Sequence, residues 1–189
     1  MAASTSDALW GCVVGRFQPF HNDHLTLVSE AYWFHGRVIV AVTNADPTRQ
    51  VAVREAPHRH LPLSNPFTFW QRHELIRAAL VDVVPLESLR IVPFAIHDAS
   101  LWQFYLPDNV QCWVRNRGPW ERRKAGDLAT RYPVHEVPAV TSEVSGTRVR
   151  EMLAGANPLW REMVPRRVAD LIDQWLADGS IRFENRANV

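Results

Sequence analysis

The sequence predicts an α/β protein built on a doubly wound parallel sheet of five strands, and three observations support this. Segments of strand character alternate with segments of helical character along the chain, which is typical of a parallel sheet with right-handed helical crossovers. Residues 38–42 read Val-Ile-Val-Ala-Val, a run typical of a strand buried on both faces. Residues 10–32 read as a strand, a glycine turn and the start of a helix. This arrangement handles phosphate in Rossmann-like folds.

Five short apolar segments are expected to be strands, because each has the length and residue pattern of a strand and is bounded by turn or helix signals. The longest apolar run among them is expected to be buried on both faces of the sheet. The expected strands are residues 8–14, 37–43, 89–94, 110–115 and 134–137.

Six segments with helical periodicity are expected between or after these strands. Cap residues, first-turn prolines and terminal glycines mark their ends. Asn22 or Asp23 would cap the first helix, and Gly179 would stop the last. The expected helices are residues 23–35, 68–80, 99–105, 119–131, 146–154 and 165–177.

The remaining segments are expected to lack regular structure. Residues 44–64 contain prolines and show no periodicity, which predicts a long loop. Residues 1–7 and 181–189 are expected to fray. No repeat, linker or low-complexity stretch divides the chain, so residues 1–189 are predicted to form a single domain with C-terminal helices.

The composition is that of an ordinary globular protein, with 189 residues, 47% hydrophobic and 22% charged residues, and a net charge of +1. This charge gives no indication of a nucleic-acid or membrane partner. No apolar run has membrane-spanning length, and residues 1–7 do not resemble a signal peptide. The expected location is therefore the cytoplasm, with Cys12 and Cys112 as reduced thiols in the core.

The basic residues are almost all arginine: 20 arginines accompany one lysine, Lys124. Coding bias is a sufficient cause of this imbalance. The sequence also lacks the G-x-x-x-x-G-K-[ST] pattern, which excludes a P-loop. Phosphate recognition is therefore expected to rest on arginine, histidine and backbone amides.

The first candidate site lies in residues 13–24, which read Val-Val-Gly-Arg-Phe-Gln-Pro-Phe-His-Asn-Asp-His. His21 and His24 are three residues apart, so both imidazoles can face one point at a helix start. Helix-start amides would face an anion there, beside the turn at Gly15. Arg16 adds a charge that does not titrate. For a His-x-x-His pair alone, two surface histidines would be the alternative.

A second candidate phosphate-binding segment covers residues 144–150, Val-Ser-Gly-Thr-Arg-Val-Arg. Ser145, Gly146 and Thr147 would open a helix and offer amides and hydroxyls to a phosphate. Arg150, about one turn later, could hold phosphate oxygens as a fork. A capping box near residues 147–151, with a one-residue misfit, is the alternative.

Both segments resemble signatures of the H-x-G-H nucleotidylyltransferase superfamily, and Gly-Arg-Phe-Gln-Pro-Phe-His in particular resembles the archaeal-type nicotinamide-nucleotide adenylyltransferases. The resemblance implies that His21 and His24 contact the α and β phosphates of a nucleotide. It also implies that Arg16 and Arg150 hold the β and γ phosphates. The further nucleotide-binding residues that it implies are Gly15, Phe17, Asn116, Arg122, Ser145, Gly146 and Thr147.

The same family carries an aspartate, an asparagine and a tryptophan that recognise the nicotinamide nucleotide. Asp98 and Trp102 match the first and the last, and the asparagine has no counterpart. Trp102 would stack on the pyridine ring, and Asp98 would accept from the carboxamide. Thr43 is also expected at this acceptor site. Core packing is the alternative for Trp102.

Residues 65–68, Asn-Pro-Phe-Thr, are followed by Arg72 and resemble another family segment. An N-cap at Thr68 explains these residues equally well. Two features depart from the family pattern. Asp23 stands where the family has glycine and is expected to turn outward as a helix cap. Residues 44–64 are longer than in the relatives, as a solvated insertion or as an active-site lid.

The reaction implied by the resemblance is adenylyl transfer from ATP to nicotinamide mononucleotide, giving NAD and pyrophosphate by direct in-line attack. Mg²⁺ would bridge the phosphates and need few protein ligands. Two alternatives remain open. One is transfer to nicotinate mononucleotide or another phosphorylated molecule, and the other is a non-catalytic nucleotide-binding regulator. The sequence leaves the oligomeric state open, with a homo-oligomer possible.

Overall fold

The computed structural model describes residues 9–139 and 143–183 of the chain. Its strands are β1 Trp10–Gly15, β2 Val38–Thr43, β3 Leu89–Phe94, β4 Val110–Arg115 and β5 Val134–Val137. Its α-helices are α1 Asn22–His35, α2 Phe69–Leu80, α3 Pro119–Ala129, α4 Gly146–Ala154 and α5 Arg166–Ala177. Short 3₁₀ turns are η1 Pro47–Arg49, η2 Pro62–Ser64, η3 Leu86–Ser88, η4 Ala99–Phe104 and η5 Pro158–Met163.

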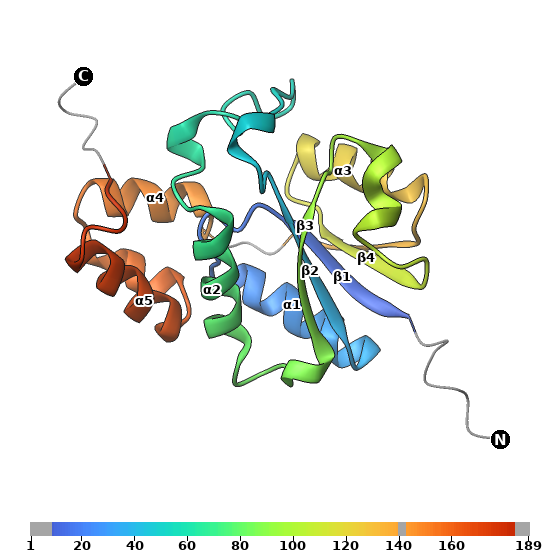
Figure 1. Cartoon of the computed structure of the whole chain (residues 1–189), viewed down its shortest axis with the longest axis horizontal. Helices are drawn as coiled ribbons and strands as arrows, with labels where there is room; N and C mark the ends of the chain where they lie inside the picture. The colour runs from blue at the N-terminus through green and yellow to red at the C-terminus, as the bar shows by residue number, and fades with distance from the viewer. Residues whose placement is uncertain (1–8, 140–142, 184–189) are drawn as a thin grey trace.

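The strands form one parallel sheet in the order β3-β2-β1-β4-β5, which confirms the predicted fold class. Helices α1, α2, α4 and α5 pack on one face of the sheet, and α3 and η4 pack on the other (Figure 1). From β1 the chain adds β2 and β3 toward one edge of the sheet. It then crosses back to form β4 on the other side of β1. The carboxyl ends of β1 and β4 therefore meet at the switch point, where such sheets bind ligands.

Each face of the sheet has its own apolar core. The core on the α3 side contains Cys12 and Cys112, which are buried free thiols opposite one another in β1 and β4. Trp102 of η4 belongs to the same core with an exposed fraction of 2%. Within residues 9–139 and 143–183, no helix combines the length and the apolar character needed to cross a membrane.

The ends of the elements differ from the sequence expectations in two places. Helix α1 starts at Asn22 with His21 as its N-cap, so neither Asn22 nor Asp23 caps it. At the C-terminal end Ile181 is buried, and Phe183 packs against Phe67 at 5.9 Å between ring centroids. The expected frayed tail is therefore wrong for residues 181–183, and the fraying expected at 1–7 and 184–189 lies outside the described residues.

Arg72 of α2 holds the loops at the carboxyl ends of β1 and β2. Its buried guanidinium donates to the carbonyl oxygens of Arg16, Thr43 and Asn44 at 2.9, 2.7 and 2.8 Å. Thr68 is the N-cap of α2, as expected, and its hydroxyl accepts a hydrogen bond from the backbone N–H of the third helical residue. The Asn-Pro-Phe-Thr segment thus acts in the structure by fixing these two strand ends.

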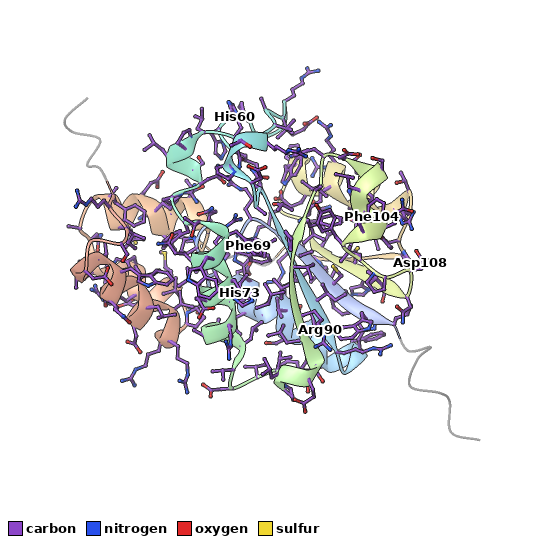
Figure 2. The ribbon with its side chains drawn as sticks, viewed as in Figure 1. His60, Phe69, His73, Arg90, Phe104 and Asp108 are labelled. Atoms are coloured by element: carbon purple, nitrogen blue, oxygen red, sulfur yellow. The ribbon has the colours of Figure 1, made fainter. Side chains whose placement is uncertain are left out.

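Residues 44–64 pack against the start of α3. Val53 and Ala56 form a small apolar cluster with Trp120, and the Arg59 guanidinium lies 5.0 Å from the centroid of the same ring. Figure 2 labels His60 on this segment, at the edge of the molecule above the sheet. Most of the segment is exposed, as expected for a solvated insertion, while Val53 and Ala56 anchor it to α3 through apolar contacts.

Candidate active site

A cavity of about 230 Å³ lies at the carboxyl ends of β1 and β4. The β1–α1 loop, the start of α4, the inner side of α3 and part of the 44–64 segment enclose it. Its charged walls are strongly cationic, with carboxylates only at Asp23 and Glu121. The cationic side chains that line it are Arg16, Arg59, Arg115, Arg117, Lys124 and Arg150. An anion is the ligand that such a wall attracts.

His21 and His24 stack in this cavity with ring centroids 3.6 Å apart and planes 20° from parallel. The backbone N–H of His21 donates to Nδ1 of His24 at 3.4 Å. Phe17 packs edge-on against His24 with ring centroids 4.8 Å apart, and this contact holds the His24 ring in place. The sequence expectation that both imidazoles face one point is met by this geometry.

Both histidines are neutral in this environment. Burial, followed by the charges of Arg117 and Arg150, lowers the pKa of His21 to about 3. Burial also lowers the pKa of His24 well below its usual range, and the neighbouring His21 adds to the effect. A bound anion would favour the protonated forms and move these pKa values back upward.

Arg16 and Arg150 line the same cavity, although Arg16 follows β1 and Arg150 lies on α4. The Arg150 guanidinium donates to the Gln18 carbonyl at 2.6 Å and to the Thr147 hydroxyl at 3.2 Å. Arg16 donates to the carbonyl of Arg59 at 3.0 Å. Burial and the neighbouring guanidiniums lower the pKa of Arg16, which reflects an excess of positive charge at this point.

The start of α4 closes against the β1–α1 loop. Ser145 is its N-cap and accepts the N–H of Arg148 at 3.2 Å, so the capping box expected near residues 147–151 is not the observed cap. A Cβ at Gly146 would lie 2.8 Å from the Gln18 carbonyl oxygen. Glycine is therefore required where the two phosphate-binding segments touch. Ser145, Gly146 and Thr147 all line the cavity.

Asp23 does not turn outward as the sequence analysis expects. Its carboxylate lines the cavity and pairs with Arg115 and Arg117 at 2.6 Å each. Arg115 also pairs with Glu30 at 3.0 Å. The outward orientation is wrong because two guanidiniums at the end of β4 offer stronger partners than a helix-start amide.

Replacement of Asp23 by asparagine should tighten the binding of inorganic tripolyphosphate by about fivefold or more, because a carboxylate about 4 Å from an anion costs roughly 1–4 kcal/mol. The free energy of unfolding should fall by roughly 2 kcal/mol, since the buried Arg115 guanidinium keeps only the partly exposed Glu30 as an ion-pair partner. Calorimetric titration and thermal unfolding measure the two effects.

Asp173→Asn is the matched control, since Asp173 pairs with Arg161 on the surface, outside the cavity. It should leave tripolyphosphate binding unchanged. Equal affinities for wild type and Asp23→Asn would contradict the inward orientation.

Five predicted residues lie outside the cavity, and Asp98 is the one among them that lines another cavity. Asn116 donates to Glu136 at 3.3 Å, and Arg122 is exposed on the outer side of α3. Thr43 is buried at the end of β2. Trp102 donates its indole N–H to the Ala95 carbonyl at 2.9 Å. The tryptophan lies in the core on the α3 side with 2% of its surface exposed, so its ring is not open to a ligand.

Asp98 lines a separate cavity of about 430 Å³ beside the ends of β2 and β3. Its carboxylate accepts the N–H and the hydroxyl of Ser100 at 3.2 and 2.5 Å, and so caps η4. Arg49 and Tyr105 line the same cavity.

Arg59 and Lys124 line the cavity although no sequence motif singled them out as site residues. The one lysine therefore stands beside the arginines and histidines from which phosphate recognition is expected. Its rarity was visible in the sequence. Its direction depends on how α3 packs on the sheet.

Together, the doubly wound sheet and the cationic cavity with paired histidines at its switch point define a nucleotide-transferring Rossmann-like protein. Residues 12–152 match the cytidylyltransferase-like family, and the chain belongs to that family.

Two curated relatives illustrate the range of the family. The chain is 33% identical to the phosphonoformate cytidylyltransferase of Streptomyces viridochromogenes over 178 residues, which cover 91% of this chain and 95% of that protein. It is 34% identical to the nicotinamide-nucleotide adenylyltransferase of Ignicoccus hospitalis over 168 residues, covering 85% and 88% of the two chains.

The fold also matches a solved structure, the bifunctional NMN adenylyltransferase/ADP ribose pyrophosphatase from Francisella tularensis. The TM-score is 0.64 and the sequence identity is 16%, so this similarity concerns the fold alone. It covers 90% of this chain and spans half the length of that protein.

Proposed function

We propose that the protein transfers a nucleoside monophosphate from a nucleoside triphosphate to a phosphorus oxyanion and releases pyrophosphate. The observation that carries this proposal is the stacked pair His21 and His24 in a cavity that Arg16 and Arg150 also line. Such a constellation concentrates neutral donors and fixed cations at one point, where a phosphorus centre gains negative charge during transfer.

In the proposed reaction an acceptor oxygen attacks the α-phosphorus in line, and the bond to pyrophosphate breaks. His21 and His24 would donate hydrogen bonds to the phosphate oxygens. Arg16, Arg150 and the start of α4 would hold the leaving pyrophosphate. No covalent enzyme intermediate is needed, so catalysis consists of positioning and charge stabilisation.

We further propose that Mg²⁺ accompanies the triphosphate. Asp23 is paired with two arginines, and Glu121 lies 3.8 Å from the Arg59 guanidinium. Across the described ranges, no group of three or more His, Cys, Asp or Glu residues is placed to hold a metal. This donor set fits an ion that takes its ligands mainly from phosphate oxygens and water. The ion would neutralise charge on the triphosphate.

Two pairs of substrates are candidates. Transfer from ATP to nicotinamide mononucleotide is supported by the Gly-Arg-Phe-Gln-Pro-Phe-His segment and by relatives named for that activity. Transfer from CTP to a phosphonate is supported by the relative named phosphonoformate cytidylyltransferase. The burial of Trp102 favours the second pair, because the residue expected to bind the pyridine ring is in the core.

The test is a matrix of ATP and CTP against nicotinamide mononucleotide, nicotinate mononucleotide and phosphonoformate, with Mg²⁺ and millimolar substrates. Pyrophosphate release and the mass of the product are measured. We expect pyrophosphate release, with the highest rate for CTP and the phosphonate. A higher rate of NAD formation from ATP and nicotinamide mononucleotide would reverse our choice of substrates. Nucleotide binding without pyrophosphate from any pair would indicate a regulator.

A further inference from the structure

We propose that Lys124 is a phosphate-binding residue of this active site, with its ammonium group against the phosphate that His24 faces. The inference rests on the proposed function for the identity of the ligand. Lys124 is the one lysine in the chain, and it lies on α3, an element that carries no recognised motif. Neither of the two phosphate-binding segments contains it.

The packing of α3 turns this side chain inward. Arg122 and Arg123 are exposed on the same helix, and Arg123 pairs with Glu55 at 2.7 Å. Lys124 instead crosses to the end of β1, where its Nζ donates to the Val14 carbonyl at 3.0 Å. The pairing of β1 with β4 ends at Val13, one residue earlier, so the ammonium lies where the two strands separate.

The ammonium group forms no ion pair within the described part of the chain, where Val14 is its one hydrogen-bond partner. The acids nearest in sequence are engaged by arginines: Glu121 lies 3.8 Å from the Arg59 guanidinium, and Asp127 lies 3.6 Å from Arg123. Glu121 acts on Lys124 from beyond ion-pair distance and raises its pKa. An ammonium has three donors, so two remain for a ligand in the cavity that Lys124 lines. A buried unpaired cation is costly, and an anionic ligand removes that cost.

The surroundings of Lys124 also give its amine an unusual acidity. Burial lowers the pKa of Lys124 to about 8, opposed by Glu121 and by the thiols of Cys112 and Cys12, and assisted by Arg59. The charge of Lys124 in turn contributes to the lowered pKa of His24, which places the two side chains near each other. Lysine carries a compact ammonium group, which needs less space between the two strands than the planar guanidinium of arginine.

The experiment uses the fact that amine reagents have one side-chain target in this chain. Pyridoxal 5′-phosphate forms an imine with the Lys124 amine as water leaves, and borohydride reduces the imine to a stable secondary amine. Labelling should rise through about pH 8, because the neutral amine reacts, whereas an ordinary lysine has a pKa of about 10.4. Tripolyphosphate should protect Lys124, as mapped by mass spectrometry of peptides.

The matched control is the double variant Lys124→Met/Arg131→Lys, which moves the single lysine to an exposed position beyond α3. Its lysine should label slowly at about pH 8 and should gain no protection from tripolyphosphate. In parallel, Lys124→Met should weaken tripolyphosphate binding by at least about tenfold, and Arg131→Met should leave it unchanged. With an active substrate pair, Lys124→Met should lower kcat more than it raises KM.

Labelling of Lys124 that saturating tripolyphosphate does not slow would overturn the proposal, as would equal affinities of Lys124→Met and wild type for tripolyphosphate. These measurements need no turnover. They therefore separate this inference from the proposed reaction, which fails if no substrate pair yields pyrophosphate while Lys124 is still protected.

Discussion

Replacement of His24 by alanine is expected to lower kcat by roughly 100-fold or more, equivalent to about 3 kcal/mol of transition-state stabilisation. The imidazole stacks on His21 at 3.6 Å and faces the cavity beside Arg150 and Lys124. Its loss removes a hydrogen-bond donor from the point where charge develops at the phosphorus. Arg150→Ala should have a comparable effect, because the fork that holds the leaving phosphates is lost.

Steady-state kinetics on the active substrate pair measure this effect, with folding checked by circular dichroism. His73→Ala is the matched control, since this partly exposed histidine lies on α2 outside the cavity (Figure 2). It should retain wild-type kcat. A second variant, His24→Asn, retains a polar group that can accept the His21 N–H. Wild-type turnover in both His24 variants would remove this residue from the mechanism.

Replacement of Trp102 by alanine is expected to lower the free energy of unfolding by about 3–5 kcal/mol. The indole is 2% exposed and packs against Phe94 and Tyr132 with ring centroids 5.6 and 6.3 Å apart. The substitution leaves a cavity in the core on the α3 side and frees the Ala95 carbonyl. The melting temperature should fall by roughly 2–4 °C for each kcal/mol in a chain of this size.

Phe104→Ala is the control on the same 3₁₀ turn. Phe104 is 75% exposed, so the free energy of unfolding should change by less than about 0.5 kcal/mol. Trp102→Phe should fold and lose less stability than the alanine variant. An unchanged melting temperature together with a raised acceptor KM would instead support the stacking role expected from the sequence.

The two sets of variants probe different regions of the molecule, the core on the α3 side and the cavity at the carboxyl ends of the strands. The core on the α3 side contains Trp102 and the buried thiols of Cys12 and Cys112. The candidate catalytic groups line the cavity at the carboxyl ends of β1 and β4. The 44–64 segment packs against Trp120 of α3, and its Arg59 lines that cavity.

The fold class and the two candidate phosphate-binding segments could be predicted from the sequence by itself. Strand and helix periodicity are local properties, and β3, β5 and α4 occupy the residues expected for them. The glycine-rich turn and the pair His21 and His24 were also recognisable, since their geometry follows from a single strand–loop–helix unit. Positions that depend on a few neighbouring residues can therefore be predicted from a local pattern.

The tertiary structure alone decided which way the remaining side chains point. Asp23 lies inward because β4 delivers Arg115 and Arg117 to it across the sheet, 92 and 94 positions later in the chain. Trp102 is in the core and Lys124 in the cavity because η4 and α3 each present one particular side to the sheet. Such contacts join residues far apart in sequence. A local periodicity cannot predict them, because the ion pair or the packed ring forms only when the chain folds.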